Sequence, residues 1–226
     1  MYKAFVFDLD GTLIDSLESI GHLFNSHLEK MGYKPCEMKL YNEFVGGGAR
    51  VLAIRAFNYI NERDNLGLNE EGILKKVEEI LPDYLYAYNN RDDKITKPYE
   101  NIVQSLTKLK EEGKVLAVCT NKPISAAKNV LDNIFGKDFF DYIFADDKNI
   151  RLKPETDMVD KLKEVSGLKD DEIIYFGDTS TDMITAVKSN IYPVGVTWGF
   201  RTEQELLESG AKAIIHKAEE ILKFLK

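Results

Sequence analysis

The sequence has little cysteine. Cys36 and Cys119 are the two cysteines among its 226 residues, and no CxxC pair occurs. Two isolated thiols cannot build a cysteine-rich zinc site, and they imply no disulfide framework. The sequence also lacks the run of about 20 apolar residues that a membrane-spanning helix needs. The opening MYKAFVFDLD has acids too early for a secretory signal peptide. We therefore expect a cytoplasmic protein with no membrane partner.

Positive charge is scarce as well, because 30 Lys and Arg residues face 38 Asp and Glu residues, for a net charge of −8. Binding to nucleic acid needs a basic stripe, so we expect no nucleic-acid partner. A chain with 44% hydrophobic and 30% charged residues suits one or two compact domains. If the ligand is an anion, the cations that bind it must be gathered at its site.

Short apolar runs bounded by turn residues recur along the chain. They span Tyr2–Phe7, Val115–Cys119, Tyr142–Ala145, Ile173–Phe176, Tyr192–Val196 and Ala213–Ile215. Continuous apolar runs of this length are typical of strands buried on both faces of a parallel sheet. Helical patterns separate the runs from residue 101 onwards. The alternation predicts an α/β fold with a doubly wound parallel sheet.

One segment breaks this alternation. Between residues 16 and 92 the apolar positions, such as Ile20, Leu23 and Phe24, follow helical spacing, and no convincing strand occurs. The chain returns from this segment to the strand–helix alternation through a polar stretch that ends at Pro98. We predict a core formed by residues 1–15 and 93–226, with residues 16–92 as an inserted all-helical domain.

Polar side chains follow four of the predicted strands, where ligands bind in open α/β sheets. FVFDLDGT places Asp8 and Asp10 after the first strand. The residues after the second, third and fourth strands are Thr120, Asn121 and Lys122; Asp146, Asp147 and Lys153; and Gly177, Asp178, Thr179 and Asp182. Any one of them could be a turn or helix cap. Together they predict a ligand site at one edge of the sheet.

Carboxylates gathered at one edge repel each other. A pair ~4 Å apart costs about 4 kcal/mol at an effective dielectric constant near 20. A cation between them would remove this cost. Oxygen ligands without histidine or cysteine favour a hard ion such as Mg²⁺.

Four short motifs resemble those of the haloacid dehalogenase-like phosphatases in order and approximate spacing. They are DLDGT at Asp8–Thr12, TN at Thr120–Asn121, KP at Lys153–Pro154 and GDTSTD at Gly177–Asp182. The helical insertion after the first motif is similar to the small cap domain of that family. The resemblance spans nearly the whole chain, and it implies a Rossmann-like core with an inserted helical cap.

The resemblance implies a role for each catalytic side chain. Asp8 would be the nucleophile that forms an aspartyl-phosphate. Asp10 would protonate the leaving oxygen and later activate water. Lys153 would place a point charge against both the phosphate and Asp8.

The same resemblance implies a set of binding residues. Mg²⁺ would be held by the Asp8 side chain, the Asp10 backbone carbonyl and Asp178. Thr120 and the backbone amide of Asn121 would hold phosphoryl oxygens. Asp182 would orient Lys153 or a metal-bound water.

Differences within the family narrow the reaction. Dehalogenases and phosphonate-cleaving members lack an acid at the position of Asp10, so Asp10 favours phosphate esters. A β-phosphoglucomutase-like mutase stays open, although Thr12 favours a hydrolase. A pyrophosphatase and a sugar-phosphate phosphatase on the same fold stay open as well. A non-catalytic phospho-switch of the receiver type would have no use for Asp10.

Two further stretches are similar to phosphoglycolate phosphatases: FVGGGARVLAIRAF at Phe44–Phe57 and GVTWGFRTEQELLESGA at Gly195–Ala211. The glycines of the first stretch could form a plain interhelical loop. Alternatively, Gly47 and Arg50 bind substrate, with Arg50 pairing with a carboxylate. We expect a small phosphorylated metabolite, most simply 2-phosphoglycolate, as the partner. Monomer and homodimer both stay open.

Overall fold

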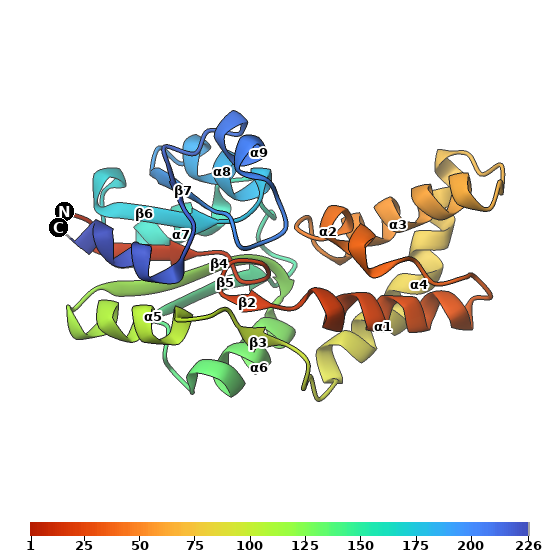
Figure 1. Cartoon of the computed structure of the whole chain (residues 1–226), viewed down its shortest axis with the longest axis horizontal. Coiled ribbons are helices and arrows are strands. Elements are labelled where there is room, and N and C mark those ends of the chain that lie inside the picture. The colour runs from red at the N-terminus through yellow and green to blue at the C-terminus, as the bar shows by residue number, and fades with distance from the viewer. Residues whose placement is uncertain (226) are drawn as a thin grey trace. The chain divides into compact units, whose positions relative to one another are not determined.

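The computed structural model describes residues 1–225, and a six-stranded sheet is its central element (Figure 1). The strands, in spatial order, are β5 (Tyr142–Asp146), β4 (Val115–Pro123), β1 (Ala4–Phe7), β6 (Ile173–Gly177), β7 (Tyr192–Val196) and β8 (Ala213–Ile215). Every neighbouring pair is parallel. The predicted parallel α/β sheet is therefore confirmed.

Strand β1 lies inside the sheet, between β4 and β6. Ala4 pairs with Val115 on one side and with Ile173 on the other. All four residues of β1 are fully buried, which explains the continuous apolar run AFVF. The Phe176 ring of β6 stacks on the ring of Phe7, with centroids 5.1 Å apart. The first motif thus leaves the sheet from a fully buried strand.

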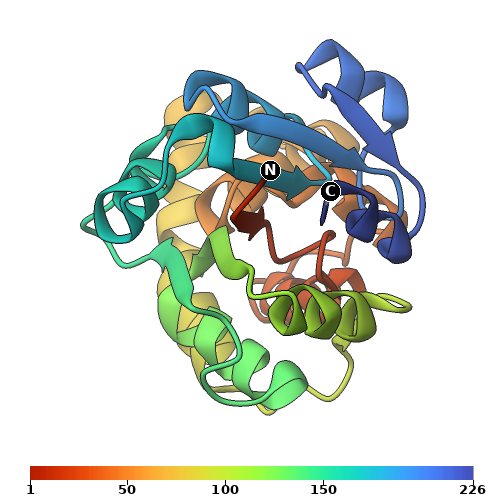
Figure 2. The same cartoon turned by 90° about the vertical axis from the view of Figure 1, so that its left-hand side faces the viewer.

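Helices cover both faces of the sheet, as a doubly wound fold requires (Figure 2). One face, which includes Phe5 and Phe7, packs against α5 (Ile102–Glu111), α6 (Ile124–Phe135) and the 3₁₀ helix η3 (Ala218–Leu225). The other face, which includes Ala4 and Val6, packs against α7 (Asp157–Ser166) and α8 (Ser180–Lys188). A short helix, α9 (Glu203–Glu208), precedes β8, and the 3₁₀ turn η2 (Asp170–Glu172) precedes β6.

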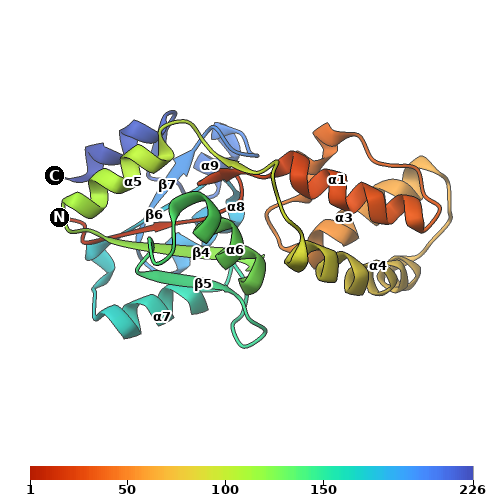
Figure 3. The same cartoon turned by 90° about the horizontal axis from the view of Figure 1, so that it is seen from below.

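A second compact unit spans Ser16–Thr96, while Met1–Asp15 and the chain from Lys97 onwards form the first. Its described elements are all helical (Figure 3): α1 (Leu17–Lys30), η1 (Met38–Leu40), α2 (Tyr41–Phe44), α3 (Ala49–Arg63) and α4 (Glu70–Asn90). It has its own core, in which the ring of Phe24 meets that of Tyr84 edge-on at 5.2 Å.

The two connections to this unit pair with each other, which the sequence did not indicate. Strands β2 (Ile14–Asp15) and β3 (Lys97–Pro98) form a separate antiparallel pair. The second boundary falls after Thr96, a few residues later than the expected boundary at 92/93.

Asp93 explains the later boundary, because its carboxylate ties the returning chain to the helical unit. It accepts hydrogen bonds from Ser19 Oγ at 2.7 Å and Thr96 Oγ1 at 2.8 Å, and it pairs with Arg91 at 2.9 Å. Burial by itself would raise the pKa of Asp93. The hydrogen bonds from Ser19 and Thr96, together with the charge of Arg91, nevertheless lower it to about 2.

We predict that Asp93→Asn lowers the free energy of unfolding by roughly 2 kcal/mol at pH 7, which corresponds to a pKa held near 2 instead of 3.8. Because the folded-state pKa is depressed, this stability is present above pH ~4 and is lost as the pH falls towards 2. Urea titrations of wild type and variant from pH 8 to pH 3 measure the difference. Asp92→Asn is the matched control, since the Asp92 side chain is 75% exposed. Equal stability of wild type and Asp93→Asn at pH 7 would contradict the assignment.

Candidate active site

The predicted site residues come together where the central strands end. Phe7 pairs with Val118 of β4 and Phe176 of β6, so the residues that follow Phe7 and Phe176 lie beside the last residues of β4, which continues to Pro123. The backbone amide of Asp8 still donates to the carbonyl of Phe176 at 2.9 Å. The parallel topology therefore brings the first, second and fourth motifs to one edge.

Three carboxylates form the centre of this edge. One oxygen from each of Asp8, Asp178 and Asp182 lies within 4.8 Å of the others, and all three residues are buried. This is a group that could hold a metal ion. Oxygen ligands from carboxylates alone suit a hard divalent cation. The residues present therefore fit the metal that the sequence predicts.

Lys153 lies between two of these acids. Its ammonium is 2.7 Å from Asp8 Oδ1 and 2.6 Å from Asp182 Oδ1, and its side chain is 1% exposed. Burial lowers the pKa of Lys153, but the carboxylates of Asp182 and Asp8 outweigh burial and raise it above its ordinary value. Lys153 is therefore a fixed positive charge beside Asp8.

Asn121 holds the backbone of Lys153. Its Oδ1 accepts from the amide of Lys153 at 2.8 Å, and its Nδ2 donates to the carbonyl of the same residue at 3.0 Å. The sequence predicted a contact from the backbone amide of Asn121 to phosphate, and it gave no indication of this side-chain role. The second motif thus positions the lysine of the third.

Asp178 is fixed by donors on both oxygens. Thr12 Oγ1 donates to Oδ1 and the amide of Phe200 donates to Oδ2, both at 2.9 Å. Gly11 has φ +92°, and a Cβ there would lie 2.2 Å from Asp178 Oδ2. Glycine is therefore required for the first motif to pass so close to Asp178.

Asp182 lies in the first turn of helix α8 (Ser180–Lys188) and also contacts Lys153. Its Oδ2 accepts from the amide and the hydroxyl of Thr179, at 3.1 and 2.7 Å, in a capping box. Its Oδ1 faces Lys153. Of the two predicted roles for Asp182, the structure displays the contact with Lys153.

Crowding of the carboxylates changes their acidity. Burial and the neighbouring charge of Asp182 raise the pKa of Asp8 to about 7, although Lys153 opposes this shift. Burial, with Asp182 and Asp8 nearby, also raises the pKa of Asp178 well above its usual value. Both pKa shifts favour the protonated carboxyl where no cation offsets the negative charge.

A second lysine contacts the other acid of the first motif. Lys122 Nζ lies 2.8 and 3.1 Å from the two carboxylate oxygens of Asp10. The amide of Lys122 donates to Thr120 Oγ1 at 3.2 Å. The sequence placed Lys122 at a strand end without giving it a role. One sequence feature could have indicated this role. Lys122 follows Thr120 by two positions, and alternate residues of a strand point to the same face, so Lys122 could be expected on the same side as Thr120.

The two predicted residues of the helical unit have local contacts. Arg50 pairs with Glu78 of α4 at 2.5 Å, and the Arg50 side chain is 52% exposed. Gly47 lies in the loop before α3, where a Cβ would be 2.7 Å from Val51. Substrate binding by Gly47 and Arg50 stays a prediction.

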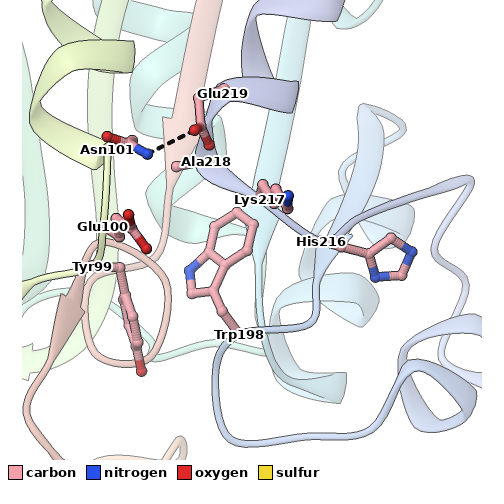
Figure 4. A pocket seen from close by; sticks show the side chains of 8 residues that line it. All are labelled: Tyr99, Glu100, Asn101, Trp198, His216, Lys217, Ala218 and Glu219. Atoms are coloured by element: carbon pink, nitrogen blue, oxygen red, sulfur yellow. Dashed lines mark hydrogen bonds between the residues drawn. The ribbon is translucent and has the colours of Figure 1, made fainter.

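A cavity of about 430 Å³ lies beside the first-motif turn in the core unit (Figure 4). Trp198 and Tyr99 line it with ring centroids 6.5 Å apart, and Asn101 donates to Glu219 at 2.6 Å. The Trp198 indole donates to the carbonyl of Thr12 at 3.0 Å. Trp198 therefore supports the turn that carries Thr12.

Helices able to span a bilayer are absent from residues 1–225, since none is both long and apolar enough.

Comparison with known proteins agrees with this geometry. The family model described as haloacid dehalogenase-like hydrolase matches residues 5–196. A phosphoglycolate phosphatase of Neisseria meningitidis serogroup A is 31% identical over 88% of this chain and 81% of its own length. One from Haemophilus influenzae is 28% identical over 99% and 98%. A crystal structure from Lactobacillus delbrueckii subsp. bulgaricus superposes with a TM-score of 0.89 at 28% identity, covering 99% of this chain and 98% of that one. The chain belongs to the haloacid dehalogenase-like hydrolase family.

Proposed function

We propose that the chain is a Mg²⁺-dependent phosphatase that hydrolyses a small phosphate monoester through an aspartyl-phosphate on Asp8. The observation that carries this proposal is the placement of the Asp8 carboxylate. It lies 2.7 Å from the buried ammonium of Lys153 and beside the carboxylate of Asp178. A nucleophile for phosphorus needs this arrangement, because an anion must approach an anionic phosphate.

In the first half-reaction, an Asp8 oxygen forms a bond to phosphorus as the bond from phosphorus to the ester oxygen breaks. Asp10 gives its proton to that oxygen, so the oxygen leaves as a hydroxyl group and not as an alkoxide. Lys153 stabilises the negative charge of the phosphoryl oxygens. The hydroxyl of Thr120, which lies inside β4, would bind one of these oxygens.

In the second half-reaction, Asp10 is an anion and accepts a proton from water. The oxygen of that water bonds to phosphorus, and the bond from phosphorus to Asp8 breaks to release phosphate. Asp10 ends protonated again, ready for the next ester. One residue thus serves as acid and then as base.

The Asp8 and Asp178 side chains, with the Asp10 carbonyl, would hold Mg²⁺, whose charge shields Asp8 from the phosphate and stabilises the phosphoryl oxygens. Thr12 and the amide of Phe200 fix the orientation of Asp178.

The proposed substrate is 2-phosphoglycolate, because several of the similar proteins are named phosphoglycolate phosphatases. A sugar-phosphate or pyrophosphate substrate and a mutase reaction are the competing possibilities on the same fold. Membership of the family does not distinguish these reactions, because enzymes that catalyse each of them share the same core motifs.

We predict Mg²⁺-dependent release of phosphate from an ester panel of 2-phosphoglycolate, glucose phosphates and pyrophosphate. Asp8→Asn should lower kcat at least ~10³-fold, because the amide is a poor nucleophile. Asp132→Asn, at an exposed position of α6, is the matched control and should keep full activity. Phosphate release is measured by colorimetry.

Two outcomes would count against the hydrolase. One is no release from any ester by the folded wild-type protein with Mg²⁺. The other is interconversion of glucose 1-phosphate and glucose 6-phosphate without release, which would indicate the mutase.

We also predict that Mg²⁺ binds more tightly as the pH rises from about 5 to 8. The raised pKa values of Asp8, about 7, and of Asp178 mean that the cation must displace protons at lower pH. Affinity should change up to ~tenfold per pH unit for each displaced proton. Calorimetric titration in two buffers of different ionisation enthalpy counts these protons. Asp8→Asn should release fewer of them, and pH-independent affinity would refute the protonation argument.

A further inference from the structure

Each acid of the first motif has its own buried lysine. Lys153 contacts Asp8 at 2.7 Å, and Lys122 contacts Asp10 at 2.8 Å, with the Lys122 side chain 4% exposed. Lys153 has a role in the proposed reaction, whereas Lys122 has none. A charge buried to this extent interacts more strongly with an anion than an exposed one does, because water screens it less.

The position of Lys122 is set by its partner. Asp10 protonates the leaving oxygen and must therefore come within hydrogen-bond distance of it. Two hydrogen bonds in series put the Lys122 ammonium within about 6 Å of that oxygen. Lys122 consequently lies on the leaving-group side, while Lys153 lies on the side of Asp8.

The ammonium can serve two anions at once. An ammonium has three N–H donors, so one of them can turn to a substrate carboxylate while another stays on Asp10. In the phosphate ester of a 2-hydroxy acid, one carbon separates the ester oxygen from the carboxylate. That carboxylate is therefore within reach of an ammonium beside the leaving oxygen.

Arg50, the carboxylate partner that the sequence suggested, is placed differently. It is half exposed and already pairs with Glu78 inside the helical unit. Exposed ion pairs contribute little, typically below about 1 kcal/mol. The buried ammonium of Lys122 should therefore bind a substrate carboxylate more strongly than the exposed guanidinium of Arg50.

We propose that Lys122 is a specificity-determining residue that binds the carboxylate of the leaving group, so that the enzyme prefers phosphate esters of short 2-hydroxy acids. The proposal rests on the proposed phosphatase function and extends it to the leaving-group side of the same site.

The test compares 2-phosphoglycolate with 2-hydroxyethyl phosphate, an ester of similar size without the carboxylate. In Lys122→Met, the ratio of the two kcat/KM values should fall at least ~10-fold, mainly through a higher KM for 2-phosphoglycolate. Lys122→Arg should retain part of the preference. Lys128→Met, an exposed lysine of α6, is the matched control and should retain all of it.

Three kinetic results would contradict the proposed role of Lys122. An equal loss for both esters in Lys122→Met, seen in kcat, would mean that Lys122 only orients Asp10, and would overturn the proposal. So would a preference that survives in Lys122→Met but disappears in Arg50→Met. A wild type that hydrolyses both esters without preference would overturn it as well.

Wild-type protein that hydrolyses no ester would instead refute the phosphatase function. If Lys122→Met does not fold, as circular dichroism would reveal, Lys122→Gln provides the same comparison, because it keeps N–H donors for Asp10 without the charge. Inhibition by glycolate adds a readout independent of the chemical step. It should weaken at least ~10-fold in Lys122→Gln, and unchanged inhibition would overturn the proposal.

Discussion

Three carboxylates within 4.8 Å of one another, closed off from water, are the constraint around which the core is organised. The positive charge of Lys153 offsets one of the three negative charges and leaves two. A divalent cation or two protons would neutralise these two. The neighbouring donors follow from the same need. Thr12 and Phe200 bind Asp178, Thr179 binds Asp182, and Gly11 leaves the space that the Asp178 carboxylate occupies.

The same edge explains how an acidic chain could attract an anion. The net charge of −8 would repel a phosphate at long range, but two buried ammonium groups lie beside the acids of the first motif: Lys122, in β4, and Lys153, in the segment between β5 and α7. Charges held in a dry site act over a short distance with little screening. Local arrangement, and not overall charge, therefore sets the chemistry.

Much of this was accessible from sequence because buried parallel strands are continuous apolar runs and because such strands end at one edge. Asp8, Asp178 and Asp182 could be grouped on those grounds. Other features depend on how loops from distant segments meet. The Asn121 side chain meets the Lys153 backbone across 32 positions, and Lys122 meets Asp10 across 112. The pair β2–β3 has two residues per strand, too few for a periodic signal. The contact of Arg50 with Glu78 needed the packing of α3 on α4, which residue type alone does not reveal.

The place of β1 in the sheet has a consequence for biosynthesis. Ala4 pairs with Val115 and Ile173, so β1 leaves the ribosome long before either neighbouring strand exists. The helical unit, complete by Thr96, is synthesised in between and can fold on local contacts. Until β4 follows, the nascent chain holds an unpaired and wholly apolar strand, of the kind that chaperones shield. Translation speed through the helical unit would then set how long that strand is exposed.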